Sequence, residues 1–373
     1  MADIGLVHEW LTTYAGSERV VEQIAHAMPI KRMYVLVDHL KDSRPAIFDD
    51  IPISTSILQK LPFSRSKYRA FLPLMPMAVE QHDVTEHDVV IASQHCVSHG
   101  VITRPDQPLI SYVHSPMRYA WDLQHEYLRN KGIEWGIRSM IARKMLHYTR
   151  TWDRVAADRV DHFVCNSKFI ASRIAKYYRR DSTVIHPPVA TNDFHLNEQK
   201  SDFYLTAGRM VPYKKTDLVV RAFAKMPDKQ LVVIGDGPEI KRVKAHAAPN
   251  IRFEGHQPFA TLRKRMGEAR AFVFAACEDF GIMPVEAQAC GTPVIAYRRG
   301  GSQETVVDGS TGILFDEQSE ASITAAVERF EEQEFPPEVC REHALGFSEE
   351  RFRKEFTDYV DRVMEGSAEP AIR

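Results

Sequence analysis

Two glutamates eight residues apart, Glu278 and Glu286, are well suited by type and spacing to chemistry on a sugar or a nucleotide. The apolar run 271–276 precedes them and predicts a short buried strand. Pro284 suits the first turn of a helix, so we expect helix N–H groups to open just beyond Gly281. Such groups attract an anion such as a phosphate. Taken alone, the two carboxylates could equally be an acid/base pair for glycoside hydrolysis or two solvated acids.

A pair of cations follows the predicted strand 203–207. Arg209 and Lys214 leave the carboxyl end of this strand five residues apart. Ligands bind at this end of the strands in open α/β sheets, and two cations there would neutralise a diphosphate. The alternative is a pair of exposed basic residues, and we expect the neighbouring Lys215 to be solvated.

Glycine turns follow two further strands. Gly16 opens a helix after the first strand, 4–7, and Gly235 lies in a Gly-Asp-Gly turn after the strand 230–234. Glycine lets a backbone approach a ligand closely, although any strand–helix connection can use such a turn. The Gly16 turn lacks the G-x-G-x-x-G spacing, which argues against a nicotinamide enzyme.

A histidine, His114, lies where the predicted strand 109–113 runs out into a loop. The sequence His-Ser-Pro-Met-Arg-Tyr-Ala-Trp-Asp begins there. Arg118, Tyr119 and Trp121 in this loop are candidates for binding a second substrate, the acceptor of a transferred group. Aromatic faces and a guanidinium bind sugars and phosphates. A packed loop with one ion pair is an equally good interpretation.

Together these segments resemble the retaining glycosyltransferases of family 4, which have the GT-B fold. The Glu-x7-Glu spacing with Phe280 and Gly281 inside it carries the resemblance, and the loop after His114 is similar to that of bacterial O-antigen and exopolysaccharide mannosyltransferases. One departure is Ala15, where the family has the first glycine of a Gly-Gly-x-Glu-Arg turn; we expect it to limit backbone freedom slightly.

The resemblance implies a role for each residue. Arg209 and Lys214 would stabilise the departing diphosphate, Glu286 would bind the ribose, and Glu278 would bind hydroxyls of the donor sugar. His114 would hold that sugar from the opposite domain. The other donor-binding residues implied are Gly16, Gly235, His256, Phe280, Gly281, Ile282 and Met283. His256 could stack on the base or be a bystander.

Alternating strand and helix patterns predict an α/β protein with parallel sheets. By resemblance this is a GT-B fold, in which two doubly wound Rossmann-like domains face a central cleft. We expect an acceptor-side domain at 1–186, a nucleotide-sugar-binding domain at 187–346, and a last helix and tail at 347–373 that return to the first domain. The consecutive prolines at 187–188 mark the boundary.

Composition excludes several classes of protein. The net charge is −2, and no run approaches the ~18–20 apolar residues of a membrane span. The start of the chain is not a signal peptide, and five scattered cysteines indicate neither disulfides nor a zinc site, so we expect a cytoplasmic protein. No D-x-D motif occurs, so we expect no metal and no other cofactor.

A basic region lies near the middle of the chain. Residues 101–190 carry 15 Lys+Arg against 8 Asp+Glu, a local net charge of +7. Within and before it, the stretches 131–146 and 61–72 mix apolar and basic residues. Either could lie on an anionic membrane at the inner face, which suits a lipid-linked acceptor. Ordinary amphipathic helices with their apolar faces in the core are the alternative.

We therefore predict a retaining transferase that moves a hexose, most simply mannose from GDP-mannose, onto a glycan or lipid-linked glycan in surface polysaccharide synthesis. We expect no nucleic-acid partner. The alternatives are another GT-B enzyme, such as a sugar-nucleotide epimerase or a glycoside phosphorylase, and a catalytically silent sugar-nucleotide binder.

Overall fold

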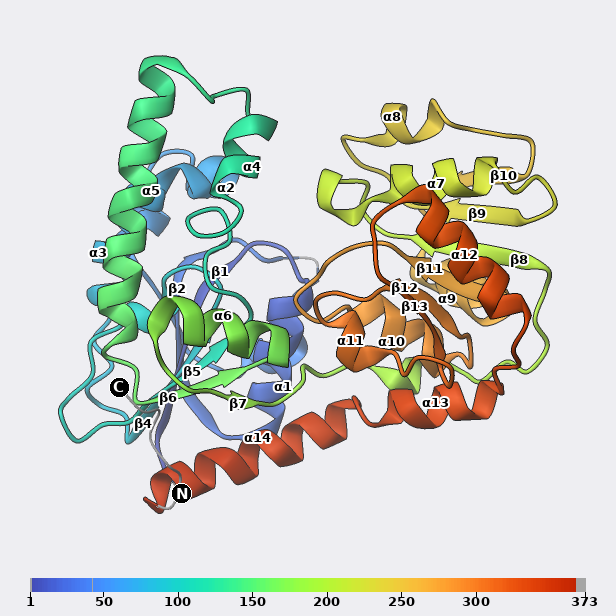
Figure 1. Cartoon of the computed structure of the whole chain (residues 1–373). Helices are drawn as coiled ribbons and strands as arrows, with labels where there is room; N and C mark the ends of the chain where they lie inside the picture. Colours follow the sequence, from blue (N-terminus) through green and yellow to red (C-terminus); the bar gives the residue numbers. More distant parts are fainter. Residues whose placement is uncertain (1, 42, 367–373) are drawn as a thin grey trace. The chain divides into compact units, whose positions relative to one another are not determined.

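The computed structural model describes residues 2–41 and 43–366, which form two compact units (Figure 1). The first unit contains the residues up to Pro188 together with those from Phe352 onward, and the second contains Val189–Arg351. Sequence patterns place the boundaries at 186/187 and 346/347, within a few residues of these positions. The confirmed α/β class follows from the parallel pairing of every strand assigned to the two sheets of the described residues.

The first unit has a seven-stranded parallel sheet, counted over the described residues, with the strand order β3-β2-β1-β4-β5-β6-β7. Its central strands are buried on both faces, as parallel sheets require, and they read as continuous Val- and Ile-rich runs. The strands are β1 Ile4–Leu11, β2 Ile30–Asp38, β3 Ile53–Thr55, β4 Val89–Gln94, β5 Leu109–Val113, β6 His162–Cys165 and β7 Thr183–Val184.

Helices cover both faces of this sheet (Figure 1). One core lies under α3, α5 and α6, and the other lies under α1 and α14. The helices are α1 Gly16–Ala27, α2 Ser64–Lys67, α3 Met75–Glu80, α4 Gln124–Asn130, α5 Gly136–Ala157, α6 Lys168–Tyr178 and, at the end of the chain, α14 Glu349–Met364.

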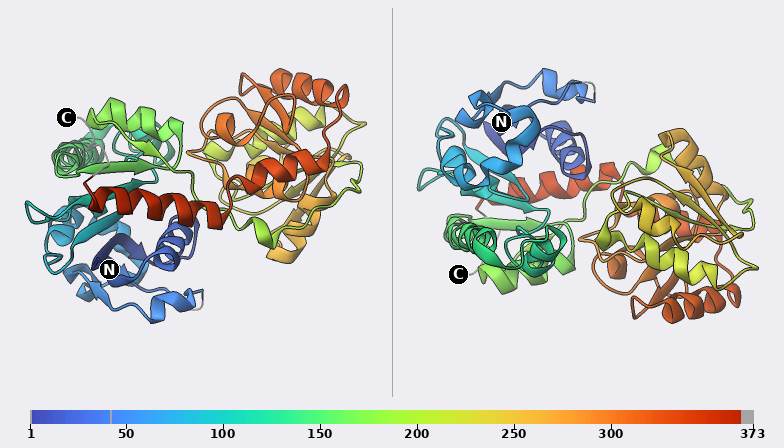
Figure 2. Two further views of the ribbon diagram at one scale, coloured as in Figure 1. Left: turned by 90° about the horizontal axis from the view of Figure 1, so that it is seen from below. Right: turned by 90° about the horizontal axis from the view of Figure 1, so that it is seen from above.

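The last helix, α14, returns to the first unit (Figure 2), which confirms that part of the predicted fold. Phe352 and Phe356 lie one turn apart and both are fully buried. Their rings pack edge-on against Tyr112 of β5 at 5.8 and 5.9 Å. Helical spacing of apolar residues in the sequence predicts this buried face.

The second unit repeats the design with a six-stranded parallel sheet of order β10-β9-β8-β11-β12-β13 among its described residues. Its strands are β8 Phe203–Ala207, β9 Gln230–Ile234, β10 Ile251–Gly255, β11 Ala271–Phe274, β12 Val294–Tyr297 and β13 Gly312–Phe315. Its helices are α7 Thr216–Ala224, α8 Ile240–Lys244, α9 Phe259–Glu268, α10 Ile282–Ala289, α11 Ser302–Thr305, α12 Glu320–Glu331 and α13 Pro337–Leu345.

The apolar runs of the sequence predict ten strands, at 4–7, 33–37, 89–92, 109–113, 162–165, 203–207, 230–234, 251–254, 271–276 and 293–296. All ten are present, with ends shifted by up to a few residues. Three short strands were missed: β3, β7 and β13. Two of them, β3 and β7, are edge strands of two or three residues, too short for a periodic pattern, and β13 follows a Gly-rich turn that reads as a loop.

Candidate functional site

Each sheet reverses its strand order at one point, and the candidate residues gather beside these two points. In the second unit the reversal lies between β8 and β11, and in the first it lies between β1 and β4. Loops at the carboxyl ends of strands diverge there, so an open α/β sheet leaves room for a ligand.

In the second unit, the loop after β8 and the start of α10 lie side by side. A Cβ atom on Gly208 would lie 3.6 Å from the Met283 sulfur. Arg209 is exposed immediately after Gly208, and its side chain forms no ion pair with the described residues. The predicted cationic loop and the predicted helix start are therefore neighbours at the same edge of the sheet.

The amino end of α10 has the backbone geometry that suits an anion. Gly281 precedes the helix with φ +87°, a left-handed conformation that side chains other than glycine's rarely adopt. The helix begins at Ile282, and Pro284 lies in its first turn as the sequence predicts. N–H groups of a first helical turn have no partner within the helix. They carry partial positive charge toward the loop that precedes them.

An ion pair joins the two loops. The Lys214 ammonium contacts the Glu278 carboxylate, and both side chains are about four-fifths buried. The Lys214 nitrogen also lies 5.8 Å from the centre of the Phe274 ring. Sequence reasoning assigns the lysine to a diphosphate and the glutamate to a sugar. In the structure the two side chains neutralise one another.

The glycine at 235 has a packing role that the sequence does not reveal. Its φ is +124°, and a Cβ atom there would lie 2.0 Å from the Gly208 carbonyl oxygen. The turn after β9 therefore packs directly on the backbone of the cationic loop after β8. Close approach of two chain segments, rather than of a ligand, is sufficient to require glycine here.

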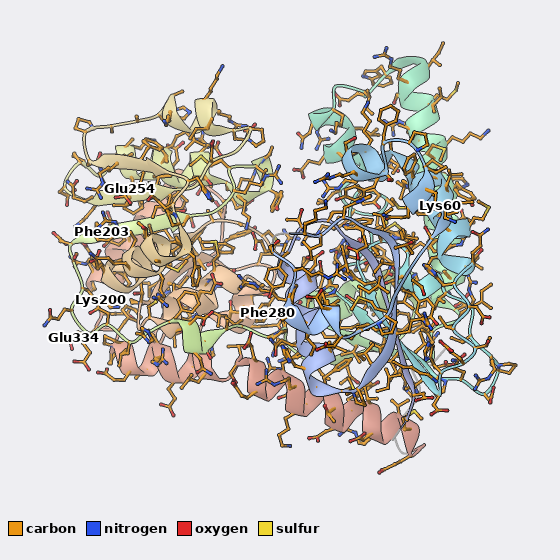
Figure 3. The ribbon with its side chains drawn as sticks, turned by 180° about the vertical axis from the view of Figure 1, so that it is seen from behind. Lys60, Lys200, Phe203, Glu254, Phe280 and Glu334 are labelled. Carbon is orange, nitrogen blue, oxygen red and sulfur yellow. The ribbon has the colours of Figure 1, made fainter. Side chains whose placement is uncertain are left out.

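The remaining donor-side residues differ in their accessibility. His256 is exposed just after β10, whereas Glu286 is buried within α10. Phe280, labelled in Figure 3, is 4% exposed and packs against Phe347 at 5.5 Å between ring centres. Its ring belongs to the core, so any contact that Phe280 makes with a donor must come from its backbone. Ile282 and Met283 are half-buried.

In the first unit, His114 follows β5 and is held from two sides. Its backbone N–H donates to the Gln94 carbonyl oxygen at 2.8 Å, and its own carbonyl accepts from the Asn166 amide at 2.9 Å. Its ring Nε2 lies 2.9 Å from the Ser93 hydroxyl. Burial, together with the positive charge of neighbouring His95, lowers the pKa of His114 to about 3. The imidazole is therefore neutral at pH 7.

Sequence reasoning missed the polar cluster that surrounds His114. His8, Glu9, Ser93 and Glu18 are buried, and His95 is partly exposed. The available signal was polar residues at the ends of otherwise apolar strands. A single buried histidine is commonly structural, and the strand register that brings these residues together cannot be read from one segment.

Glu9 anchors the loop that follows β4. One carboxylate oxygen accepts backbone N–H groups at 2.8–3.3 Å from the four consecutive residues His95, Cys96, Val97 and Ser98. The other oxygen lies 2.9 Å from the His95 ring. Burial alone would raise the pKa of Glu9, but the charge and hydrogen bonds of His95 outweigh it and hold the pKa far below its ordinary value.

This cluster also contains a possible metal-ligand set. Ligand atoms of His8, Glu9 and His95 all lie within 4.8 Å of one another. Two imidazoles and a carboxylate suit a transition metal. Every one of these side chains already has a protein partner, however, and the absence of a metal requirement stays a prediction.

The turn before α1 is formed without strain. Gly16 is the first residue of α1, and Ala15 precedes it with φ −142°, extended backbone that any residue adopts. The expected loss of freedom at Ala15 is therefore not a handicap here. The Glu18 carboxylate accepts the Ala15 N–H at 3.0 Å, which stabilises the start of the helix.

Tyr119 and Trp121, two of the three proposed acceptor residues, are packed into the first unit. The Tyr119 hydroxyl lies 3.1 Å from the Cys96 sulfur. The Trp121 indole N–H donates to Asp153 at 2.7 Å, and its ring stacks on Tyr177. The structure thus favours the packed-loop interpretation for these two side chains. Arg118, the third, is half-buried.

A polar cavity of about 410 Å3 lies elsewhere in the first unit. Its lining includes Arg32, Tyr34 and His82, and none of the predicted site residues. Within the part of the chain that the structure describes, no helix is both long enough and apolar enough to cross a membrane.

Comparison with known families agrees with this arrangement. Residues 14–193 match the model described as Glycosyltransferase Family 4, and residues 190–346 match Glycosyl transferases group 1. An uncharacterized glycosyltransferase of Methanocaldococcus jannaschii is 30% identical over 175 residues, 46% of this chain and 49% of that protein. A GDP-mannose-dependent alpha-(1-6)-phosphatidylinositol monomannoside mannosyltransferase of Mycolicibacterium smegmatis is 29% identical over 214 residues, 49% of this chain and 56% of that protein. The chain spans about half the length of the curated relatives it matches.

Solved structures share the fold at low sequence identity. Sucrose-phosphate synthase of Thermosynechococcus elongatus superposes with a TM-score of 0.73 at 17% identity, covering 98% of this chain and 100% of that one. HepE of Anabaena, determined with UDP and glucose, gives a TM-score of 0.65 at 16% identity over 97% of this chain and 100% of that one. The two family matches run consecutively through nearly the whole chain, and the chain therefore belongs to the family 4 (group 1) glycosyltransferases with the GT-B fold.

Proposed function

We propose that this protein is a retaining glycosyltransferase that moves a hexose from a nucleotide-sugar, most simply mannose from GDP-mannose, onto a glycan or lipid-linked glycan in surface polysaccharide synthesis. The observation that carries the proposal is the arrangement at the β8/β11 edge. Arg209, Lys214 and the open start of α10 lie at one edge of the sheet, where ligands bind in α/β folds. This edge suits a nucleoside diphosphate.

The ion pair between Lys214 and Glu278 suggests how the donor binds. A diphosphate carries more negative charge than one carboxylate and would compete with Glu278 for the lysine. Glu278 would then be released to accept hydrogen bonds from the donor sugar. Glu286 would bind the ribose, with His256 at the base and His114 on the sugar.

The reaction is a substitution at the anomeric carbon. The bond from this carbon to the phosphate oxygen breaks, and the acceptor oxygen forms the new bond on the same face. The acceptor proton passes to the departing diphosphate. Arg209, Lys214 and the α10 N–H groups stabilise the charge that grows on the leaving group, commonly the largest contribution to such catalysis. The relative from Mycolicibacterium smegmatis supports GDP-mannose.

A thermal-shift panel of GDP-, UDP- and ADP-sugars tests the donor. A ligand that binds only the folded state raises its stability. We expect the largest shift with GDP-mannose. A large shift with a UDP-sugar alone would overturn the mannose assignment, and no shift with any nucleotide-sugar would overturn the donor site.

Two further assays test the reaction class. Product analysis without acceptor separates a transferase from an epimerase, which would release an isomerised sugar. Activity should persist in the presence of a chelator. Complete loss that manganese restores would contradict the proposed metal independence.

We also propose contact with an anionic membrane through the amino end of α5. Trp135 is 91% exposed and Ile137 73% exposed, so the alternative of an apolar face packed in the core is wrong for this turn. It lies at the tip of the projecting α4–α5 hairpin (Figure 1). The exposed cations Lys131, Arg138 and Lys144 surround these residues and complement acidic lipid headgroups.

Liposome pelleting tests this contact. The protein should pellet with vesicles rich in phosphatidylglycerol at low salt, and Trp135→Ser combined with Ile137→Ser should release it. Val307→Ser, which changes an exposed apolar residue of the second unit, is the control. A wild-type protein that stays in the supernatant contradicts the membrane proposal and leaves the donor proposal intact.

A further inference from the structure

Four side chains of the first unit form a continuous line of hydrogen bonds that ends at His114. Glu18 Oε1 lies 3.4 Å from His8 Nε2, and His8 Nδ1 lies 3.1 Å from the Ser93 hydroxyl. That hydroxyl lies 2.9 Å from His114 Nε2. The line is therefore carboxylate, imidazole, hydroxyl, imidazole.

The fold fixes every member of this line. His8 and Ser93 are direct partners on the neighbouring parallel strands β1 and β4, at the point where the strand order reverses. Glu18 comes from the first turn of α1, which follows β1. His8 and Ser93 are 1% and 0% exposed, so bulk water does not compete for the hydrogen bonds between these side chains.

The chemistry of the line gives it a direction. An ionised carboxylate only accepts hydrogen bonds, so the His8 proton lies on Nε2, facing Glu18, whereas the Glu9 carboxylate lies 3.7 Å from His8 Nδ1, beyond hydrogen-bond length. His8 Nδ1 then accepts the hydroxyl proton of Ser93, and the Ser93 oxygen accepts a proton from His114 Nε2. We propose that Glu18, His8 and Ser93 act as positioning residues that hold His114 in the Nε2–H tautomer, with its Nδ1 as an acceptor toward substrate.

The free nitrogen of His114 is available for that role. Nδ1 has no hydrogen-bond partner among the described residues, and it is not enclosed by protein atoms. A neutral imidazole with a bare Nδ1 accepts a hydrogen bond from a hydroxyl and does not attract a phosphate. A sugar hydroxyl fits this nitrogen. The assignment to a sugar rests on the proposed function, whereas the tautomer does not.

Charges around the line agree with its direction. Burial would raise the pKa of Glu18, but its hydrogen bonds, first among them the one to His8, outweigh burial and lower it. Burial would lower the pKa of His95, yet Glu9 raises it, so a positive charge beside His114 favours the neutral form of His114. The Tyr112 ring packs edge-on against His114 at 5.2 Å and adds no charge.

Glu18 also links this line to the turn that begins α1. Its second oxygen accepts the Ala15 N–H and the Ser17 hydroxyl, both at 3.0 Å. One carboxylate therefore sets the shape of the Gly16 turn and the proton position on His114.

Replacing Glu18 by glutamine should reverse the whole line. In Glu18→Gln the amide oxygen must keep the Ala15 N–H, so the NH2 group faces His8 Nε2 and donates to it. His8 Nδ1 then donates to Ser93, Ser93 donates to His114 Nε2, and the His114 proton moves to Nδ1. Long-range 1H–15N spectra of histidine-labelled protein distinguish the two tautomers, and His114→Gln identifies the His114 resonances.

We expect the Nε2–H tautomer in the native protein and the Nδ1–H tautomer in Glu18→Gln. The Nδ1–H tautomer in the native protein, or no change in the variant, would overturn the inference. A metal ion retained by the purified protein on His8, Glu9 and His95, detected by elemental analysis, would also overturn it.

Turnover gives the second readout. Ser93→Ala breaks the line and should lower kcat about tenfold or more, with a smaller change in KM. Ser111→Ala is a matched control, because Ser111 is equally buried on β5 and its hydroxyl has no hydrogen-bond partner among the described residues. It should change kcat less than about twofold. A native tautomer as predicted with full activity in Ser93→Ala would support the line but refute the sugar-binding role of His114.

Discussion

The carboxyl edges of the two sheets share one feature of topology, a reversal of strand order, but they differ in their electrostatics. At the β1/β4 edge of the first unit, buried imidazoles, carboxylates and a hydroxyl bond to one another. At the β8/β11 edge of the second unit, Arg209 is exposed and the start of α10 offers N–H groups to an anion. The first edge holds one neutral ring in a defined orientation, whereas the second keeps positive charge available.

The largest test of this difference removes charge from the second edge. Lys214→Gln should lower kcat/KM by about 10²-fold or more, because it removes a partly buried cation that stabilises the negative charge growing on the leaving diphosphate. Steady-state kinetics with the best donor of the thermal-shift panel measures it. Lys215→Gln, the same change one residue later, should stay within about threefold; equal losses in both variants would contradict the assignment of Lys214.

A second test compares a carboxylate from each edge. Glu9→Gln should reduce the free energy of unfolding by roughly 2–4 kcal/mol, because it weakens a fully buried acceptor of four N–H groups beside His95. Glu278→Gln should lower the free energy of unfolding by only about 1 kcal/mol or less. The same substitution should abolish most turnover. Urea unfolding and kinetics on both variants check this. An unchanged free energy of unfolding in Glu9→Gln would contradict the proposed contribution of the Glu9 hydrogen bonds to the stability of the first unit.

The smallest expected effect is a pH dependence of the first unit. Burial lowers the pKa of His82 to about 4 and, with the positive charge of His95, that of His114 to about 3. Below their ordinary pKa of 6.5 the unfolded chain binds protons that the folded chain refuses, so stability falls as the pH falls. His95, whose pKa is raised, opposes this trend. We expect a loss of roughly 1–2 kcal/mol between pH 7 and 5.5.

All four tryptophans lie in the first unit, so their fluorescence during urea unfolding reports on that unit alone. Circular dichroism, which follows both units, serves as the comparison. Stability of the first unit that rises on acidification would mean that the raised pKa of His95 outweighs the two lowered ones.

Much of the second edge was predictable because its signals are local. Glu278, Gly281 and Pro284 lie within one strand–loop–helix segment, and the start of α10 follows from glycine and proline chemistry. Arg209 and Lys214 follow a strand that its apolar pattern identifies. The ion pair between Lys214 and Glu278 was not predictable, because it joins loops 64 residues apart in the sequence.

The first edge could be predicted only in part for the same reason. His114 was identified from its own loop, but its partners Ser93 and His8 come from two other strands. Tyr119 and Trp121 looked available in the sequence, and the fold bonds them to Cys96 and Asp153 instead.

By itself, the sequence determined the α/β class, ten strands, the start of α10 and the residue types at both edges. These depend on periodicity, turn chemistry and apolar runs, all of which act over a few neighbouring residues. The tertiary structure decided which polar groups are paired. Strand register brings His8 beside Ser93, loop packing brings Lys214 to Glu278, and burial excludes the water that would otherwise compete for these hydrogen bonds.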